Sequence, residues 1–395
     1  MRVGVNCLQI DPSYVGGVNT YTFGLLDGFA KQVNGGSFQL YVHAGNQHLF
    51  EQYRSQAGWE VVVVNDPLLP MKRRISRAAL LASDRLFYKR TSDLLFGRVQ
   101  REMEADSDVL YTPTVVLQSF NSRKPTVLSM HDIQHVHYPE FFSWGRRLSR
   151  NITYGLSASH ANWFQASSEF IKQDLLAHFR DLAPQQIAVI AEGVNTAEFS
   201  APIKHDSHLG KHDLPDRFLF YPAQLWPHKN HITVLKALKE IETLHGVKIP
   251  LVLTGAAYSA APEILEFIKQ HSLDYVAYLG KVPFEDLVGL YQRAAYLITA
   301  VLYESSSLPI LEAAAAGTPI IASKTPPNVE LSRVLQLNLF EPLDVEGLAG
   351  MIHRLWNDKQ AADLQIAHNR HHIVAYSWEN TARQYLDFFE TVLNG

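Results

Sequence analysis

The feature that most constrains the fold of this chain is an alternation of short apolar runs with longer segments of helical period. Seven apolar runs in the first half and six in the second have the length expected of buried strands. Parallel strands need a crossover of a dozen or more residues between them, and a helix supplies it. The alternation therefore predicts an α/β protein whose parallel sheets are covered by helices on both faces.

A polar segment, residues 196–216, separates the two series of strands and contains two prolines and one glycine without either periodicity. A chain of 395 residues also favours two domains over one. We therefore expect a Rossmann-like N-terminal domain over residues 1–200 and a Rossmann-like C-terminal domain over residues 201–375. An amphipathic segment, residues 376–395, is predicted to close the chain as a long helix.

The composition narrows the class of partner and the location. The formal net charge of -4 gives no basic face for nucleic acid, so no nucleic acid partner is expected. Cys7 is the single cysteine and lies in an apolar run, which excludes an internal disulfide and predicts a buried thiol. The sequence shows neither a secretory signal nor an apolar window of membrane-spanning length, so we expect a cytoplasmic protein.

A strand-to-helix loop in the second half, within "YESSSLPILEAAAAG", predicts an anion site. Ser305–Ser307 follow an apolar strand and stand directly before a helix that starts with a proline in its first turn. The free N–H groups of a helix start bind phosphate, and small residues allow a close approach. Glu304 lies at the strand end and Glu312 about one turn inside the helix. The alternative is that Ser307 caps the helix and both glutamates are solvated.

This block resembles the family 4 retaining glycosyltransferases of the GT-B fold. Glu304 and Glu312 match the E-x7-E pattern of these enzymes, and "LPILEAAAAGTPIIAS" is similar to their "GLPxLEAMAxGxPVIAS" block. The segments "LFYPAQLWPHKNHITVLKAL", "YLGKVPFEDLVGLYQRA" and "VIAEGVNTAEF" and the N-terminal "GGV" extend the resemblance. It implies two Rossmann-like domains that face each other across a cleft, with the C-terminal helix packing back on the N-terminal domain. It also implies that the enzyme needs neither a catalytic metal nor a cofactor.

The resemblance implies a nucleotide-diphosphate sugar, with UDP or GDP, as donor. Glu312 would bind the ribose hydroxyls and Glu304 the donor sugar, while the backbone of Ser306, Ser307 and Leu308 would hold the diphosphate. Lys229 would be the phosphate cation, and Gln224 stands where the family usually has arginine. The serine triplet replaces a common Gly-Phe-Gly. The implied donor-binding set is completed by Gly16, Gly17, Gly280 and Val282, and the implied catalytic residues are His131, Glu304 and Lys229.

In the first half, "VLSMHDIQHVHYPEFF" places His131 and Asp132 just past a strand. The resemblance implies that His131 contacts the donor sugar or an acceptor hydroxyl and that Asp132 orients it or acts as a base. A metal site must be weighed because His135 and His137 follow, but the spacing matches no compact zinc motif, and we expect no metal. His135 and His137 are alternatively structural histidines. The acceptor side is expected to include Asp132, Arg146 and Arg147.

Residues 70–101 belong to a predicted helical stretch that runs from the 70s to 105 and concentrate basic and apolar side chains. They could contact an anionic leaflet at the inner membrane face, although a solvated basic face of a covering helix is an equal alternative.

The resemblance predicts a retaining glycosyltransferase that moves a sugar from a nucleotide sugar to a hydroxyl of a glycan or lipid-linked glycan. The alternatives are a sugar-nucleotide epimerase on the same fold and a non-catalytic binding protein.

Overall fold

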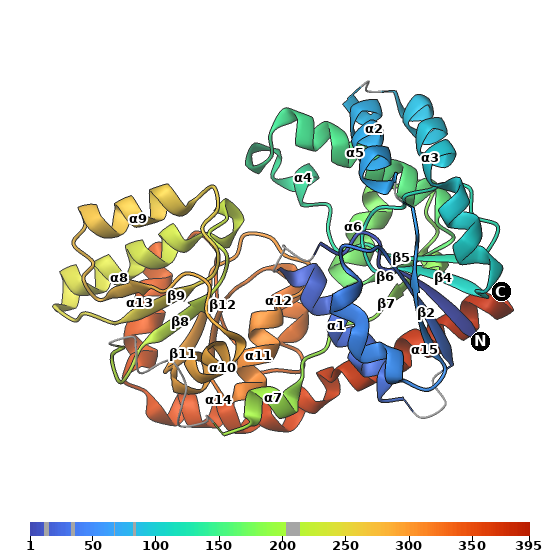
Figure 1. The fold of residues 1–395 in the computed structure, drawn as a ribbon. Coiled ribbons are helices and arrows are strands. Elements are labelled where there is room, and N and C mark those ends of the chain that lie inside the picture. Colours follow the sequence, from blue (N-terminus) through green and yellow to red (C-terminus); the bar gives the residue numbers. More distant parts are fainter. Residues whose placement is uncertain (12–15, 33–35, 67, 82–83, 203–213) are drawn as a thin grey trace. The chain divides into compact units, whose positions relative to one another are not determined.

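The computed structural model describes residues 1–11, 16–32, 36–66, 68–81, 84–202 and 214–395. Within these ranges the chain forms two compact units, Met1–Gly193 with Trp378–Gly395, and Val194–Ser377 (Figure 1). The chain enters the second unit seven residues before the sequence-based boundary, because Val194 and Phe199 are buried in the second unit's core. The first residues of the expected linker form a short helix, α7 (Thr196–Ser200), and residues 203–213 lie outside the described ranges.

The first unit is built on a seven-stranded parallel sheet in the order β3-β2-β1-β4-β5-β6-β7. All seven strands predicted in the first half are present. The order reverses direction between β1 and β4, which defines the switch point where ligands of such sheets bind. The strands are β1 (Arg2–Asn6), β2 (Ser37–Val42), β3 (Trp59–Val63), β4 (Val109–Thr112), β5 (Thr126–Ser129), β6 (Trp163–Ala166) and β7 (Ile187–Val189).

Helices connect these strands, and one predicted helical stretch forms two separate helices. The helical stretch predicted from the 70s to 105 is α2 followed by α3, and Asp84 caps α3 by accepting a hydrogen bond from the N–H of Phe87. The helices of the first unit are α1 (Gly17–Ala30), α2 (Leu69–Leu81), α3 (Arg85–Ala105), α4 (Gln134–His137), α5 (Trp144–His160), α6 (Glu169–His178) and α15 (Trp378–Asn394), with short 3₁₀ turns at Gln47–Ser55, Pro139–Phe141 and Pro184–Gln186.

The second unit holds a six-stranded parallel sheet in the order β10-β9-β8-β11-β12-β13, with its switch point between β8 and β11. All six strands predicted in the second half are present. The strands are β8 (Leu219–Pro222), β9 (Leu251–Thr254), β10 (Val276–Tyr278), β11 (Tyr296–Thr299), β12 (Ile320–Ser323) and β13 (Asn338–Phe340).

The strands of the second unit are mostly apolar because both faces of the sheet are covered. Leu219 and Tyr221 face one hydrophobic cluster, which also contains residues of α8, α9 and α13, while Phe218 and Phe220 face another, with residues of α7, α10, α11 and α12. The helices are α8 (His231–His245), α9 (Ala261–Gln270), α10 (Phe284–Arg293), α11 (Leu308–Ala316), α12 (Pro326–Leu331), α13 (Val345–Trp356) and α14 (Lys359–His372), with 3₁₀ turns at Pro227–Lys229 and Ile373–Tyr376.

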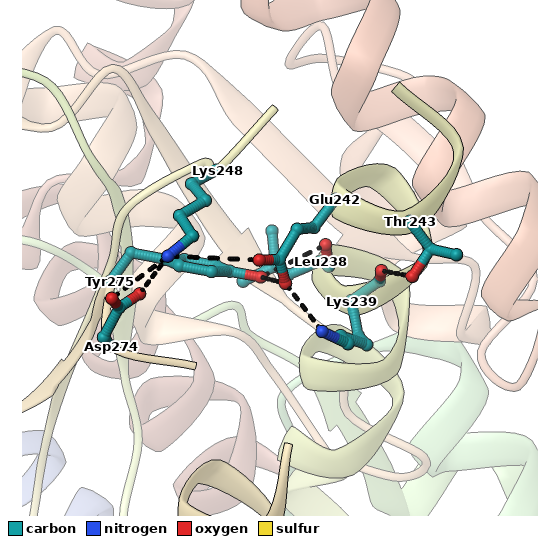
Figure 2. Close-up of polar contacts among 7 residues, drawn as sticks. All are labelled: Leu238, Lys239, Glu242, Thr243, Lys248, Asp274 and Tyr275. Atoms are coloured by element: carbon teal, nitrogen blue, oxygen red, sulfur yellow. Dashed lines mark hydrogen bonds and ion pairs between the residues drawn. The ribbon is translucent and has the colours of Figure 1, made fainter. Parts of the chain in front are cut away.

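Figure 2 shows a charged network on the surface of the second unit, where α8 ends. Lys248 Nζ lies 2.7 Å from Asp274 Oδ1 and 4.0 Å from Glu242 Oε1. Glu242 also accepts hydrogen bonds from Lys239 and Tyr275, and the bond from Lys239 lowers the pKa of this carboxyl. The network ties α8 to the turn before β10. Because these charges are exposed, salt screens them and they contribute little to stability.

The closing helix α15 packs on the first unit, as predicted, and lies against α1. Three glycines make room for the first residue of α15, Trp378. A Cβ atom built on Gly24 would lie 2.2 Å from the Trp378 ring, and one on Gly28 would lie 2.3 Å from the Trp378 carbonyl oxygen. A Cβ atom built on Gly193 would lie 2.6 Å from the Trp378 backbone nitrogen. The two helices can pack only because these positions lack side chains.

Buried hydroxyl groups hold the other end of the α1 and α15 contact to the sheet. Tyr21 on α1 hydrogen-bonds Tyr111 at 2.8 Å, Ser129 at 3.0 Å and Tyr385 on α15. Ser129 also lies 3.1 Å from the Tyr385 hydroxyl. Every hydroxyl in this group has partners, so its burial costs little and fixes α1 and α15 relative to β4 and β5.

Replacing Gly24 by alanine should destabilise the first unit. The added methyl group overlaps the Trp378 ring, and overpacking of this kind costs about 1–3 kcal/mol. Gly97 on α3 is the matched control, since a Cβ atom there meets nothing closer than 3.6 Å. Alanine at that helical position should stabilise by roughly 0.5–1 kcal/mol. Unfolding of both variants in urea measures the two effects, and equal changes of the same sign would contradict the close approach.

Candidate functional site

The switch point of the second sheet brings together two loops that the sequence singles out. The loop after β8 contains Gln224 and Lys229, and the loop after β11 contains Glu304 and the serine triplet. The N–H of Leu302 donates to the His228 carbonyl at 2.8 Å, and Asn230 Nδ2 donates to the Ala300 carbonyl at 3.0 Å. The two loops are therefore held side by side at the carboxyl edge of the sheet.

Tyr221 on β8 fixes both loops from below. Its buried hydroxyl accepts a hydrogen bond from the Ala300 N–H at 3.0 Å and donates to the Lys229 carbonyl. The Tyr221 ring stacks on the buried His231 ring, with centroids 4.5 Å apart. Burial lowers the pKa of His231 to about 3, and the nearby Lys229 ammonium acts in the same direction. A neutral histidine under the loop leaves Lys229 as the positive charge at this point.

Lys229 and Glu304 form an ion pair, with 3.3 Å between Nζ and Oε2. The Glu304 side chain is only 7% exposed, and among the described residues its other oxygen, Oε1, has no hydrogen-bond partner. A solvated Glu304 is therefore excluded. An ionised carboxylate that is buried with one oxygen unpaired costs free energy, which a ligand hydroxyl could recover.

Ser307 occupies the N-cap position of α11 without capping it. Its carbonyl accepts hydrogen bonds from the N–H groups of Ile310 and Leu311, but its side chain makes no cap contact. The Ser307 hydroxyl is buried and has no partner within the described ranges. The alternative of an ordinary serine cap is therefore wrong. Ser306 and Leu308 flank it on a helix start whose N–H groups suit an anion.

Glu312 lies one turn into α11 and accepts a 2.5 Å hydrogen bond from the buried hydroxyl of Tyr291 on α10. Burial raises the pKa of Glu312 to about 7, and the bond from Tyr291 opposes this rise only in part. Glu312 is only partly buried as a residue, so a ligand can approach it. Tyr291 orients it for that contact.

Gln224, Gly280 and Val282 lie around neighbouring strand ends of the same edge. Gln224 Oε1 accepts a 2.9 Å hydrogen bond from the indole N–H of Trp226, so its side chain supports a residue of the loop. Gly280 has a φ of 67°, and space around its Cα is open. Val282 is half-buried against the hydrophobic cluster below. The structure thus brings Lys229 and Glu304 together beside α11, and Gln224 lies in the same loop as Lys229. Gly280 and Val282 follow β10, two strands from β8.

His131 of the first unit lies just past β5 and is buried. Its Nε2 lies 2.9 Å from the Pro113 carbonyl, which can only accept, so Nε2 carries the proton. Burial lowers the pKa of His131, and a neutral ring leaves Nδ1 as an acceptor. The ring packs edge-on against Tyr21, with centroids 4.8 Å apart. His131 is therefore suited to accept a hydrogen bond from a hydroxyl group.

Asp132 makes contacts different from those expected. Its Oδ1 accepts hydrogen bonds from the Gln134 N–H at 3.1 Å and from Arg150 at 3.3 Å. The group that orients the His131 ring is the Pro113 carbonyl, and Asp132 instead positions α4 and Arg150. Arg146 and Arg147, on the first turn of α5, are exposed.

Gly16 and Gly17 stand at the start of α1. Gly16 is the N-cap residue, and its carbonyl accepts hydrogen bonds from the N–H groups of Asn19 and Thr20. Its φ of -170° is ordinary extended backbone, so the position does not require glycine for its backbone angles. Among the residues that the structure describes, a Cβ atom on Gly17 would meet nothing within 4 Å.

The first unit also contains a polar cavity that the sequence did not predict. It has a volume of about 360 Å³ and lies at the switch point between β1 and β4. The Gln9 side chain links the loops after β1 and β4 by donating a 2.5 Å hydrogen bond to the Val116 carbonyl. In the sequence, the only sign of this cavity is that some of its lining residues follow the first predicted strand. The polar side chains of its lining are Gln9, Asp11, His43, Arg73, Ser76 and Gln118.

The histidines after β5 do not gather around one point. His135 is buried, and its ring packs against Tyr154 at 5.1 Å, while His137 Nε2 lies 2.7 Å from Asp174 Oδ1. Within the described ranges, no three side chains of His, Cys, Asp or Glu are arranged to hold a metal ion.

Comparison with known protein families gives two matches that together span most of the chain. Residues 15–198 match the model described as Glycosyltransferase Family 4, and residues 206–372 match the model described as Glycosyl transferases group 1. The N-terminal match ends close to the point where the chain passes into the second unit.

Among curated proteins, the chain is similar to O-antigen chain mannosyltransferase B of Escherichia coli. The two are 23% identical over 266 residues, which cover 67% of this chain and 70% of that protein. O-antigen chain mannosyltransferase RfbU of Salmonella typhimurium is 26% identical over 199 residues, covering 50% of this chain and 52% of that protein. The serotype-specific mannosyltransferase WbdA of Escherichia coli is 25% identical over 240 residues, and the match covers 58% of this chain and 28% of WbdA. The chain therefore spans a minor part of WbdA.

Solved structures with the same fold cover the whole chain. Alr3699/HepE of Anabaena, crystallised with UDP and glucose, superposes with a TM-score of 0.71 and 18% identity over 99% of this chain and 100% of that chain. The sucrose-phosphate synthase of Thermosynechococcus elongatus superposes with a TM-score of 0.72 and 19% identity over 100% of this chain and 99% of that chain. These likenesses show that the fold is GT-B, as expected from the sequence.

Replacing Glu312 by glutamine tests the buried carboxyl through its pH dependence. The pKa of Glu312 is about 7 in the folded protein and about 4.5 in the unfolded chain. Between these values the unfolded chain binds fewer protons, so the free energy of unfolding falls as the pH rises through this window and stays low above it. We expect the free energy of unfolding of Glu312→Gln, relative to that of the wild type, to increase by on the order of 2 kcal/mol from about pH 5 to about pH 8.

Urea unfolding of both proteins at the two pH values measures this difference. Glutamine keeps the acceptor for the Tyr291 hydroxyl, so the loss of that bond does not confuse the result. A constant difference between the two proteins would contradict a raised pKa at Glu312.

Proposed function

This chain is a glycosyltransferase of the GT-B fold and belongs with family 4, and we propose that it transfers a hexose from a nucleotide-diphosphate sugar to a hydroxyl of a glycan or lipid-linked glycan, with retention at the anomeric carbon. The observation that carries this proposal is the pair of Lys229 with the buried Glu304 side chain beside the uncapped start of α11. Positive charge, an uncapped helix start and an unpaired carboxylate oxygen meet there. A diphosphate linked to a sugar would satisfy all three.

The proposed reaction breaks the bond between the anomeric carbon and the diphosphate oxygen and forms a bond from that carbon to the acceptor oxygen. The acceptor proton passes to the departing diphosphate oxygen on the same face, so no carboxylate nucleophile is required. Negative charge grows on the diphosphate as the bond breaks. Lys229 and the N–H groups at the start of α11 stabilise this charge, which is the largest contribution that such a site can make.

Lys229 carries more of this task here than in relatives that have arginine at the position of Gln224. Gln224 has no charge, and its carbonyl oxygen is engaged by the Trp226 indole. The pairing of Lys229 with Glu304 keeps the ammonium in place before the donor arrives. In this proposal Lys229 and the helix start supply all of the charge stabilisation, so the reaction uses neither a metal nor a cofactor.

Glu312 is proposed to bind the ribose of the donor. An ionised carboxylate can accept hydrogen bonds from two neighbouring hydroxyls, and Tyr291 holds it in position. Because burial raises the pKa of Glu312 to about 7, hydroxyl groups that donate to it favour the ionised form. Donor binding and ionisation of Glu312 are therefore coupled.

The acceptor is proposed to bind the first unit. The polar cavity at the switch point between β1 and β4 offers hydrogen-bonding groups to a sugar, and His131 can accept a hydrogen bond from a hydroxyl. The similarity to two O-antigen chain mannosyltransferases supports a bacterial surface glycan as the class of acceptor and mannose as the first sugar to test. The UDP complex of the Anabaena structure supports UDP-sugars as a second set of donors.

Alanine variants of Lys229 and Glu312 test the assignment. We expect each to lower kcat at least ~100-fold, because each removes a polar group that contacts the donor. Lys236→Ala is the matched control, since Lys236 is exposed on α8 and lies seven residues from Lys229. Turnover is measured as release of the nucleoside diphosphate in the presence of acceptor, and wild-type turnover of either variant would exclude the proposed site.

A panel of UDP-, GDP- and ADP-sugars, screened for an increase in the thermal unfolding midpoint, identifies the donor. A ligand that binds only the folded state raises this midpoint by mass action. Product analysis with the bound donor alone distinguishes transfer from epimerisation, because an epimerase would change the sugar nucleotide without an acceptor. If calorimetry shows that the chain binds no sugar nucleotide of the panel, both transfer and epimerisation are excluded.

A further inference from the structure

Exposed apolar side chains gather on three helices of the first unit. These helices, α2, α3 and α5, contact one another, and Figure 1 shows them grouped at one side of that unit. Within the described ranges, no helix is both long enough and apolar enough to cross a bilayer. The exposed large apolar side chains on or directly before the three helices are Leu68, Met71, Ile75, Leu86, Phe87, Leu94 and Trp144.

On α2 these side chains form one continuous face. Met71, Ile75 and Ala78 follow one another at spacings of four and three residues, and Leu68 precedes them by three. This spacing puts all four on the same side of a helix. All are exposed, while Ser76, which lines the cavity on the inner side of the helix, is buried. The apolar face of α2 therefore points to solvent, which is the reverse of what a covering helix needs.

On α3 apolar and basic side chains alternate along one exposed face. Phe87, Arg90, Leu94, Arg98 and Arg101 succeed one another at spacings of three or four residues. Leu94 is 84% exposed, the largest value among the exposed large apolar side chains. The pattern differs from the inner face of α3, which buries Tyr88, Phe96 and Met103.

The start of α5 adds an aromatic side chain and two charges. Trp144 is 73% exposed, and Arg146 and Arg147 follow it. The surface of the three helices is strongly basic, although the whole chain has a formal charge of -4. Two exposed carboxylates, Asp84 and Glu102, accompany a larger number of exposed arginines. These arginines are Arg74, Arg85, Arg90, Arg98, Arg101, Arg146 and Arg147.

We propose that this face, formed by α2, α3 and the start of α5, docks on the surface of an anionic lipid bilayer. The apolar side chains enter the boundary between headgroups and acyl chains, and the arginines bind lipid phosphates. The excess of exposed arginines over carboxylates on this face is the charge that anionic headgroups attract, which favours a bilayer as the partner. Interfacial helices of membrane-bound proteins combine the two kinds of side chain in this way.

Docking would also specify the acceptor, and this step rests on the proposed function. The inner sides of α2 and α3 line the polar cavity of the first unit, with Arg73 and Ser76 from α2 and Tyr88 and Phe96 from α3. Helices that wall the cavity on one side and hold the bilayer on the other bring the cavity close to lipid headgroups. The acceptor class that this arrangement suits is a lipid-linked glycan.

Flotation of the full chain with vesicles tests the docking. We expect the chain to bind vesicles of equal parts phosphatidylglycerol and phosphatidylcholine, to bind pure phosphatidylcholine weakly, and to dissociate from the anionic vesicles as the salt concentration rises. The double variant Leu94→Glu, Trp144→Glu should lose at least ~10-fold of the bound fraction, since it replaces inserted side chains with charges that anionic lipids repel. Both positions are exposed, so the variant should unfold at the wild-type temperature.

Leu364→Glu is the matched control, because Leu364 is a helical leucine of the second unit, 60% exposed on α14. It should float like the wild type. The docking is overturned if the wild type does not prefer anionic vesicles, or if the double variant binds them as well as the control does. Stabilisation by donor sugars is measured in parallel on both proteins. Its absence from the wild type while flotation persists would refute the proposed function and leave the docking intact.

Discussion

The packing of α15 on α1 is the contact on which the first unit depends. The chain leaves this unit at Gly193 and returns to it at Trp378, so the backbone on either side of the excursion meets at this contact. Trp378 fits because Gly24, Gly28 and Gly193 lack side chains. The contact sets the position of α1. Tyr21, on the same helix, then packs its ring against His131 and joins its hydroxyl to the group around Ser129.

In the second unit, Tyr221 performs the corresponding task. One buried hydroxyl contacts the backbone of both loops at the switch point, so the ammonium of Lys229 and the carboxylate of Glu304 are held close without depending on each other alone. This matters because a buried ion pair does not pay for its own desolvation. The loops must be positioned by neutral contacts, and the pair then orients the charges that they carry.

Much of the fold followed from the sequence because its signals are local. All thirteen strands were predicted, since strands buried on both faces are apolar runs that need no knowledge of their partners. The break between α2 and α3 and the short helices α7 and α12 were not predicted, because tertiary contacts and not periodicity determine them. The motif positions around Glu304 and Glu312 were recognisable from their spacing. The cavity lined by Gln9, His43 and Arg73 was not, because its residues come from separate loops and helices.

The unpaired groups beside α11 explain why the chain can place three serines there. A buried hydroxyl and a buried carboxylate oxygen without partners, at Ser307 and Glu304, each cost about 1–3 kcal/mol of stability. A sequence under selection for stability alone would satisfy them, for example by a true N-cap at Ser307. Glycine at these positions would leave fewer unpaired side-chain atoms but also fewer groups to contact a ligand. Ser307 therefore adds hydrogen-bonding capacity to a helix start, and in the proposed function a diphosphate sugar would supply the missing partners and recover the cost.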